Sequence, residues 1–446
     1  INCIKRTIMG KIYDKASYII PTGIAYTEAE AWAITNPSIT DNGKMTFDRN
    51  GITHRTTNCN IEEIASDIPR IDYEDGYSHI SMQAYNQNLQ TYSEFSTGWI
   101  NGATTLALNA GVSPDGHINA AAIQVNGTGT LSECSFRRSA GGQSAGYYVY
   151  SVYLKALNDL RYVSIQIWTG DNATDLMATF DLVDGKKVTG AGGFSDNGEG
   201  KIQELSDGWY RVSVSGNIAS SATLTQYIYL REDTSGVGVS NFNDNGVYAF
   251  GAQLERVAPF NTTYPALPSA YIKTTSATVS QVRDQGYIST FTPTSTKATI
   301  YGWIRLRSEW GGTADEQDNN YTIFGFVNGT TNHYSIYYWG ADGDKFGFNT
   351  WSGDSYGITG STIHDGEWHK VVAVFDFNDF TQGKLFIDGV KQSISQTRAT
   401  TVQRSAAPFA LSSPTTSNQS PACDYREVVV FDQGLPDDEC ITLSTL

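Results

Sequence analysis

Short runs of β-branched and aromatic residues, separated by turns that contain glycine, constrain this chain more than any other feature. In the run Tyr162–Trp168 (YVSIQIW), aliphatic residues occupy every second position. Turn pairs follow such runs, as at Asp184-Gly185 and Asn245-Gly246, and Asp388-Gly389 after the run 385–387 predicts a hairpin. Successive side chains of a strand point to opposite faces, so this period of two predicts strands with one face in a core. Short strands between glycine-bearing turns predict an all-β fold of antiparallel sandwiches.

Length and composition divide the chain into parts. At 446 residues it exceeds a single core, and its 17% charged residues, 43 Gly and 26 Tyr suit sandwiches with polar loops. The sequence predicts an extended N-terminal adaptor at 1–86 and two antiparallel β-sandwiches at 87–284 and 285–446. The first part has recurrent turns and few apolar clusters, so we expect it to pack on something else. The polar stretch 274–286 predicts the linker between the sandwiches.

The net charge of -16 argues against a nucleic-acid partner, because phosphate binding requires clustered Lys and Arg. No apolar run is long enough to span a membrane, and no signal peptide is visible. The chain begins at Ile1, which is consistent with processing or an incompletely read start. The five cysteines show no zinc spacing and favour free thiols, with a Cys423–Cys440 disulfide as the alternative. We therefore expect assembly in a cytoplasm followed by life outside the cell.

Catalytic motifs are missing from the sequence, so we expect no enzyme. There is no GxSxG elbow, no HExxH and no P-loop. A glycosidase needs two carboxylates that face one cleft, and the nearest candidates, Glu367 and Glu427, form no E-x-D-x-x-E arrangement. His364 and His369 are five apart around Trp368 and offer a metal pair, with structural roles as the favoured alternative.

Calcium is the one cofactor that the sequence suggests. Ca²⁺ prefers six to eight oxygen ligands from carboxylates, amides and carbonyls. Oxygen-bearing side chains cluster in predicted loops at Asp342, Asp344, Asp376, Asn378 and Asp379. The alternative is that Asp and Asn stand there because they favour turns.

Carbohydrate contact is the predicted function of the second sandwich. Sugars present apolar C–H faces and hydroxyl groups, so their sites pair exposed aromatic rings with polar side chains. The candidate contacts lie in polar or Gly-rich segments: Trp310, Tyr338, Trp351, Asp354 and Tyr356. Core or intersubunit packing is the alternative for Trp351. Trp303 and Trp368 stand in strand-like contexts and are predicted to be core, whereas the tyrosines at 147–153 favour core or an intersubunit interface.

Three groups of motifs, in order along the chain, resemble bacteriophage tail-fibre and head-fibre proteins. The first group comprises Tyr13-Asp14-Lys15-Ala16-Ser17, Pro69-Arg70-Ile71-Asp72-Tyr73 and the stretch 88–95 (NLQTYSEF). It resembles the N-terminal region of those fibres, with a loose match at 48–55 and a departure at 77–85. The second group, Asp207-Gly208-Trp209 and the later 251–255 (GAQLE), resembles their carbohydrate-binding-module-like jelly roll.

The third group lies in the second sandwich. Asp365-Gly366-Glu367-Trp368-His369, then Ile387-Asp388-Gly389 and the run 427–431 (EVVVF), resemble a concanavalin A-like, laminin-G-type lectin domain. Each motif alone is moderately specific, since such sandwiches carry many functions. Their order along most of the chain is more persuasive.

The resemblance implies a virion surface fibre or adhesin. It would bind other virion proteins through residues 1–86, form a homo-oligomer (a trimer is favoured) and touch a host-surface glycan. Two alternatives stay open. A ligand-free head or tail decoration protein would bind no glycan, and a polysaccharide-degrading tailspike would place paired carboxylates in a cleft.

Overall fold

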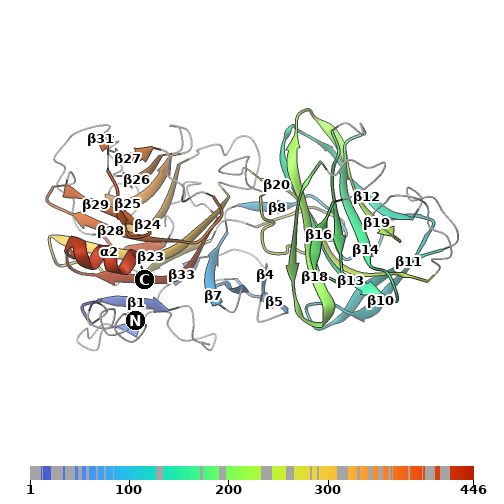
Figure 1. The fold of residues 1–446 in the computed structure, drawn as a ribbon, viewed down its shortest axis with the longest axis horizontal. Coiled ribbons are helices and arrows are strands. Elements are labelled where there is room, and N and C mark those ends of the chain that lie inside the picture. Colours follow the sequence, from blue (N-terminus) through green and yellow to red (C-terminus); the bar gives the residue numbers. More distant parts are fainter. Residues whose placement is uncertain are drawn as a thin grey trace.

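The computed structural model of the chain describes residues 12, 14–21, 34–35, 46–48, 53–56, 60–66, 69–74, 77–83, 85–126, 134–170, 174–189, 197–232, 244–257, 266–281, 284–288, 291–308, 320–328, 332–339, 345–349, 355–359, 363, 365–379, 382–393, 395–396, 407–411 and 422–445. It is almost entirely β, and Figure 1 shows two sandwiches side by side. The predicted all-β class with two sandwiches is confirmed. The stretch 27–33 (TEAEAWA), whose composition predicts a helix, lies outside the described residues.

The first sandwich pairs two six-stranded antiparallel sheets. The β13 sheet has, in spatial order, β10 (Thr104–Val112), β11 (Ile118–Val125), β20 (Gly246–Val257), β13 (Gly146–Leu157), β18 (Trp209–Ile218) and β17 (Glu199–Glu204). The β14 sheet has β16 (Lys186–Val188), β15 (Leu176–Asp181), β14 (Tyr162–Trp168), β19 (Ala222–Arg231), β12 (Ser135–Gln143) and β9 (Ile100–Gly102). The short 3-10 turn η1 (Ser206–Gly208) leads into β18.

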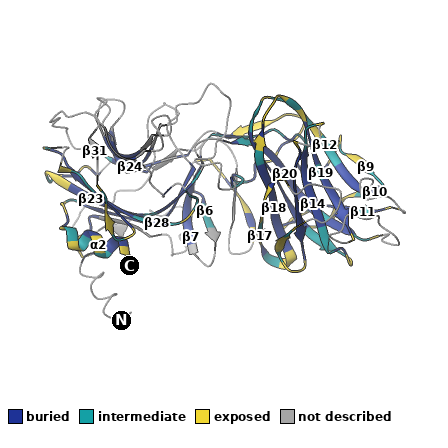
Figure 2. Ribbon diagram, turned by 45° about the horizontal axis from the view of Figure 1, so that its top comes forward, coloured by how far each residue is buried: buried dark blue, intermediate teal, exposed yellow. Residues whose placement is uncertain are grey.

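Alternation along these strands builds the first core. Val163, Ile165 and Ile167 of β14 are all buried in it, as their spacing of two predicted. Tyr148 and Tyr150 of β13 join the same core, so two of the four tyrosines of this strand pack between the sheets. Figure 2 shows the buried strands running through the middle of both sandwiches.

The second sandwich is formed by larger sheets. The β23 sheet has β2 (Ile34–Thr35), β1 (Tyr18–Pro21), β33 (Ala422–Phe431), β23 (Lys297–Ser308), β28 (His369–Asp376), β29 (Lys384–Ile387) and β30 (Val390–Lys391), with β7 (Tyr77–Met82) paired to β33 and β6 (Ile71–Glu74) paired to β7. The β24 sheet has β3 (Thr46–Asp48), β22 (Gln285–Ile288), β32 (Phe409–Leu411), β24 (Asn320–Asn328), β25 (Asn332–Trp339), β26 (Lys345–Asn349), β27 (Ser355–Thr359) and β31 (Ser395–Gln396).

A helix that the sequence did not predict covers part of the outer face of the β23 sheet. Helix α2 (Asp437–Thr445) places Cys440 and Leu443 against Val429 and Phe431 of β33. Asp437 at its first turn lies 2.6 Å from both the Lys384 and the Lys391 ammonium groups. Acidic side chains at a helix N-terminus are favourable, because they complement the helix dipole.

The strands within residues 1–86 do not stand apart from the sandwiches. In the second sandwich, β1 and β7 both pair with β33, and β3 pairs with β22. The hairpin β4 (Thr53–Thr56) and β5 (Ile61–Ile64) lies instead against the first sandwich, where Ile61 packs with Tyr153 and Phe250. Figure 1 shows β4, β5, β7 and β8 between the sandwiches. A segment poor in apolar clusters therefore packs on the two cores of its own chain.

The motifs of the first sandwich meet where the chain enters and leaves it. Strand β8 (Asn86–Asn88) pairs with β21 (Val279–Gln281), which lies in the predicted linker. The Asn88 amide donates to the carbonyls of Ala252 and Ile272, at 3.2 and 2.8 Å. Its Oδ1 accepts the N–H of Leu254 at 3.1 Å. Hydrogen bonds from Asn88 therefore hold the motif at 88–95 against the motif at 251–255.

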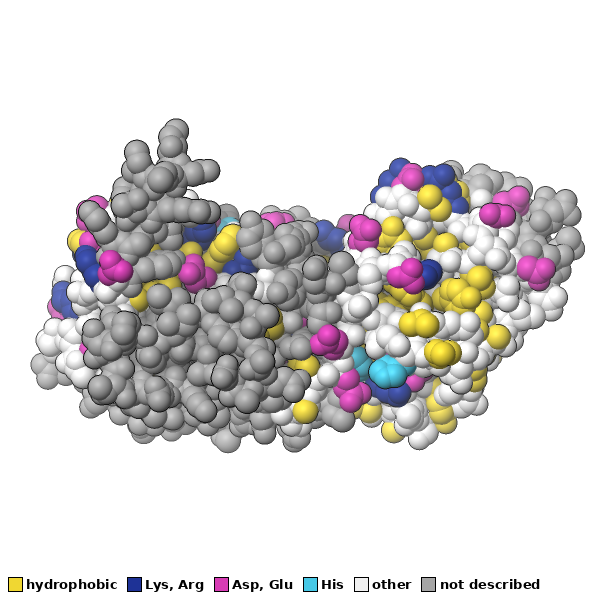
Figure 3. Space-filling model, turned by 90° about the horizontal axis from the view of Figure 1, so that it is seen from below, with side chains coloured by type: hydrophobic (Ala, Val, Ile, Leu, Met, Phe, Trp, Pro, Cys, Tyr) yellow, Lys and Arg dark blue, Asp and Glu magenta, His cyan; other side chains and the backbone are white. Residues whose placement is uncertain are grey.

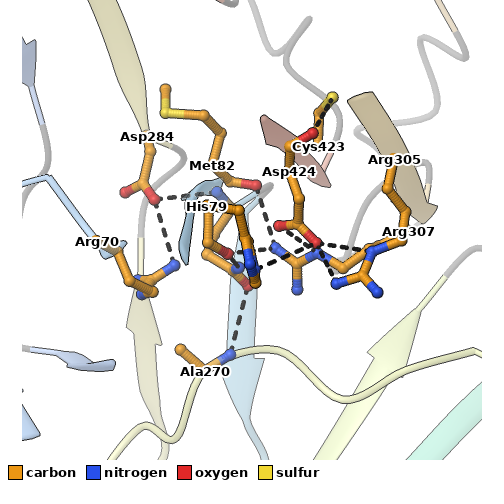
Figure 4. A network of polar contacts seen from close by, with 11 residues as sticks. Arg70, His79, Met82, Ala270, Asp284, Arg305, Arg307, Cys423 and Asp424 are labelled. Atoms are coloured by element: carbon orange, nitrogen blue, oxygen red, sulfur yellow. Dashed lines mark hydrogen bonds and ion pairs between the residues drawn. The ribbon is translucent and has the colours of Figure 1, made fainter. Parts of the chain in front are cut away.

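A buried network of charges joins the N-terminal segment, the linker and the second sandwich (Figure 4). Asp424 of β33 lies 2.7 Å from the Arg305 guanidinium and 2.9 Å from that of Arg307. The Asp284 carboxylate of the linker accepts the Gln83 N–H at 3.0 Å and lies 3.4 Å from Arg70. Arg307 also donates to the Ser81 hydroxyl of β7 at 2.8 Å. Charges contributed by three segments therefore fix how these segments meet.

Cys423 and Cys440 are free thiols, as favoured from the sequence. Cys423 lies in the core between the second sandwich's sheets, and Cys440 is a residue of α2 that packs on the other face of the β23 sheet. Figure 3 shows that acidic side chains are scattered over the face in view and do not gather into one patch. Within the described part of the chain, no helix has the length and apolar character of a membrane span.

Candidate functional site

Most of the predicted sugar contacts lie outside the described residues. These are Trp310, Trp351 and Asp354. The backbone of Tyr338 lies in β25, paired with Phe346, and that of Tyr356 lies in β27, paired with Phe348. The three strands β25, β26 and β27 are neighbours, so the two tyrosines lie in one part of the β24 sheet. Their role in sugar contact stays a prediction.

The predicted calcium ligands are only partly described. Asp342 and Asp344 lie outside the described residues. Asp376 ends β28, and its Oδ1 accepts the backbone N–H groups of Asn378 and Asp379 at 3.0 and 3.1 Å. Its Oδ2 lies 2.9 Å from the Lys297 ammonium. Asp376 therefore stabilises a turn, and in the described ranges no group of His, Cys, Asp and Glu is arranged to hold a metal. Calcium binding stays a prediction.

His369 joins two motifs of the second sandwich. Its Nδ1 lies 2.7 Å from the Asp388 carboxylate and its Nε2 lies 3.0 Å from Asp365. Asp388 and Gly389 both have positive φ, of 48° and 81°, as the hairpin predicted from Asp-Gly requires. Burial lowers the pKa of His369, but the hydrogen bonds to Asp388 and Asp365 outweigh it and leave the pKa above its usual value. The His369 ring therefore links the turn at Asp365 to the turn at Asp388, and the strength of this link depends on pH.

We expect the stability of the second sandwich to depend on His369 between neutral and alkaline pH. A raised pKa means that the ring's contribution is full below about pH 6.5 and is lost as the pH rises through the folded-state value. Urea unfolding between pH 6 and pH 9 should therefore show a decline in the native chain that His369→Gln lacks. Equal pH slopes in the two proteins would rule out this coupling.

Trp303 and Trp368 are not part of the core between the sheets, which corrects their expected placement, although Trp303 packs against the buried cluster on the outer face of the β23 sheet. Ile300 and Ile304 of β23 point into that core. Successive side chains of a strand point to opposite faces, so Trp303, the neighbour of Ile304, lies on the outer face. Both tryptophans are half-buried, and their ring centroids are 6.2 Å apart. Strand context alone did not say which face each ring would take.

The first sandwich carries an aromatic surface that the sequence analysis did not single out. Trp168, Tyr227 and Tyr229, with Arg137, Gln166 and Asp175, form what we call the aromatic face. Because Ile165, Ile167 and Ile228 fill the core, the residues between and beside them point out of the β14 sheet. Arg137, Tyr227 and Gln166 stand directly opposite one another on three neighbouring strands.

The rings of the aromatic face are ordered by mutual contacts. Tyr227 and Tyr229 stack with centroids 5.1 Å apart and planes 3° from parallel. Trp168 meets Tyr227 edge-on at 6.2 Å, and the Arg137 guanidinium lies 5.5 Å from the Tyr227 centroid. Trp168, Tyr227 and Arg137 are half-buried, whereas Tyr229 is buried. The half-buried rings therefore present partly accessible apolar surface beside a cation.

A chain of hydrogen bonds runs beneath these rings. The Tyr229 hydroxyl donates to Gln166 Oε1 at 2.8 Å, and Gln166 Nε2 donates to Asp175 Oδ2 at 2.8 Å. Asp175 Oδ1 accepts the backbone N–H of Thr169 at 2.9 Å. Burial is the main cause that raises the pKa of the Tyr229 hydroxyl, so this group stays a neutral donor at physiological pH. Accessible aromatic rings over a fixed polar row can contact both the C–H face and the hydroxyl groups of a sugar.

The comparisons with known proteins define the second sandwich. Residues 269–440 match the family described as the Concanavalin A-like lectin/glucanases superfamily. The second sandwich is a concanavalin A-like domain. No curated protein sequence matches the chain.

Solved structures give only distant similarities. A botulinum neurotoxin C/D mosaic receptor-binding domain has 11% identity and a TM-score of 0.26, covering 35% of this chain and 39% of that one. Domain 4 of an arabinanase from Geobacillus stearothermophilus, in complex with arabinotriose, has 15% identity and a TM-score of 0.26, covering 42% and 85%. Trypanosoma rangeli sialidase has 9% identity and a TM-score of 0.25, covering 86% and 63%. The chain thus spans about two fifths of the neurotoxin domain, 39%. At these scores the similarities carry no functional argument.

Proposed function

We propose that this chain is a structural fibre protein of a bacteriophage particle that contacts host-surface carbohydrate. The aromatic face carries the carbohydrate part of the proposal, because half-buried Trp168 and Tyr227 lie beside Arg137 over the polar row Gln166–Asp175. The concanavalin A-like domain supports it, since lectins share this fold. The placement on a virion surface rests on the ordered motif resemblance of the sequence.

The proposal includes a homo-oligomer, with a trimer favoured, and contacts to other virion proteins through residues 1–86. The described strands of that segment pair with the chain's own sheets, so a partner would bind parts of the segment outside those pairings. Sedimentation of the purified chain tests the oligomer, and a monomer at micromolar concentration would contradict it.

We also propose that the chain binds and does not cleave its glycan. Glu367 lies in an exposed turn, and Glu427 lies within β33 opposite Trp303. A glycosidase needs two carboxyl groups on either side of one glycosidic bond. Incubation of the chain with a bound polysaccharide should release no soluble oligosaccharide, and release of sugar products would favour a tailspike enzyme.

A glycan array with and without a calcium chelator tests the carbohydrate proposal. We expect saturable binding to at least one class of saccharide. Loss of binding with chelator would support calcium at the Asp342–Asp379 loops, and loss in Trp351→Ala would support the site predicted in the second sandwich. No binding to glycans or to host cells, together with a stable multimer, would favour the ligand-free decoration protein.

A further inference from the structure

Cations and indole rings alternate on the outer face of the β23 sheet. We call Lys370, Trp303, Arg426, Trp368 and Arg305 the cation–tryptophan ladder. Lys370 Nζ and Arg426 Cζ each lie 4.9 Å from the Trp303 ring centroid. Arg426 Cζ also lies 4.1 Å from the Trp368 centroid, and Arg305 Cζ lies 4.7 Å from it. Each ring therefore lies between two cations.

A β-bulge places the central arginine of this ladder. In the pairing of β23 with β33, Trp303 stands opposite Glu427 and Ile304 stands opposite Tyr425, so Arg426 is the extra residue. A bulge bends its strand and redirects a side chain. Here it brings the Arg426 guanidinium to the two rings, while Tyr425 and Val428 stay in the core. Cross-strand pairing of Trp303 with Lys370 completes the row.

Several cations gather on this face, although the whole chain carries a net charge of -16. Arg307 stands behind the ladder and shares the Asp424 carboxylate with Arg305. Asp424, which is fully buried, and Glu427 lie among these cations, and Asp388 accepts the backbone N–H of Lys370 at 2.9 Å. A row of cations attracts anions.

Solvent exposure determines which residues of the ladder a ligand can contact. Lys370, Trp303, Arg426 and Trp368 are half-buried, so each reaches solvent in part. The guanidinium N–H groups lie in the plane of the group, and this plane suits the paired oxygens of a carboxylate or sulfate. The ladder crosses three neighbouring strands, β28, β23 and β33, which makes a row of about 10 Å at ~4.8 Å per strand. A row of cations suits a chain with repeated anions better than a single ion.

We propose that the cation–tryptophan ladder binds the carboxylate or sulfate groups of an acidic polysaccharide. This inference rests on the proposed carbohydrate function. It adds a second binding site, on the second sandwich, that distinguishes charged from uncharged saccharides. Arg426 and Lys370 pair with successive anions, and the edges of Trp303 and Trp368 contact the sugar between them. Arg305, which is paired with Asp424, fixes the end of the row next to Trp368.

Polygalacturonate and its fully methyl-esterified form test the proposal on the intact chain, because they share a backbone and differ in charge. We expect the charged polymer to bind at least ten-fold more tightly in low salt, and to weaken as salt rises. Arg426→Gln should lower its affinity at least ten-fold, and Lys370→Gln should lower it several-fold. Lys186→Gln, an exposed lysine on the first sandwich, is the matched charge control and should bind as the native chain does.

Three outcomes would overturn the inference. Equal binding of the two polymers would remove the role of charge, and native affinity in both Arg426→Gln and Lys370→Gln would remove the ladder. Displacement of the polymer by sodium acetate at the same carboxylate concentration would show a small-anion site and no saccharide site. Thermal unfolding of each variant separates lost binding from lost folding. Retention of acidic-polymer binding in a Trp168→Ala, Tyr227→Ala double variant would keep this site separate from the aromatic face.

Discussion

Replacing Asp424 with Asn is expected to destabilise the second sandwich by about 3–5 kcal/mol. Asn has the same shape, so the cost is electrostatic. Arg305 donates to Asp424 Oδ2 at 2.7 and 3.1 Å, and Arg307 lies 2.9 Å from Oδ1, in a site from which Asp424 exposes 0% of its surface. Removing the carboxylate leaves two guanidinium groups largely buried without their shared counter-charge (Figure 4). Urea unfolding followed by tryptophan fluorescence measures the loss, because Trp368 lies against Arg305.

The same substitution should change the response to acid. Burial alone would raise the pKa of Asp424, but Arg307 and Arg305 outweigh it and hold that pKa well below its usual range. A lowered pKa contributes stability above the unfolded value of about 3.9, and this contribution is lost as the pH falls below it. Between pH 5 and pH 2 the native chain should therefore lose more stability than Asp424→Asn.

Asp207→Asn is the matched control for Asp424→Asn. Asp207 pairs with Lys155 at 2.7 Å, but 77% of its side chain is exposed. Solvent screens such a pair, so we expect a loss well below 1 kcal/mol. If Asp424→Asn proved as mild as this control, the buried network would not hold β7 and the linker against the second sandwich.

The second large effect is expected at the aromatic face. Trp168→Ala together with Tyr227→Ala should weaken binding of a glycan that the native chain binds by about 30-fold or more, since truncating an aromatic anchor in a binding site costs about 2 kcal/mol. Both rings lie outside the core, so folding should be retained. Isothermal titration with the best saccharide from the array measures the change.

Tyr162→Ala provides the control for this pair. Tyr162 is half-buried at the other end of β14, where the Arg161 guanidinium lies 5.3 Å from its ring. An aromatic side chain is therefore removed from the same strand, away from Tyr227. Comparable losses in Tyr162→Ala and in the double variant would point to a general effect on the sheet and would argue against a sugar platform at Trp168 and Tyr227.

The buried network and the N-terminal segment together imply a rigid display unit. Strand β7 contributes Ser81 to the network, and the same segment contributes Ile61 and His54 to the first sandwich. His54 Nδ1 lies 3.0 Å from the Tyr271 carbonyl, at the exit of that sandwich. A segment that touches both cores limits their relative motion, and the aromatic face and the ladder would then be presented at a fixed separation.

The sequence by itself determined the local features of this protein. A period of two identified β14 with the bounds observed, because alternation is a property of neighbouring residues. The Asp388-Gly389 hairpin followed equally from local chemistry, since only residues that tolerate positive φ suit its turn. The concanavalin A-like domain was recognised from short motifs, and the family match at 269–440 confirms it.

Only the tertiary structure decided which residues come together. The pairing of β1 with β33 joins residues about 400 positions apart, and no local pattern specifies such a partner. The aromatic face was missed because Tyr227 and Trp168 lie on separate strands, although the alternation of Tyr227, Ile228 and Tyr229 showed that the tyrosines share a face. Arg426 reaches the tryptophans through a bulge, and a bulge becomes visible only once the register of two strands is known. Strand identity is local, whereas pairing, register and the face turned to solvent depend on packing across the whole chain.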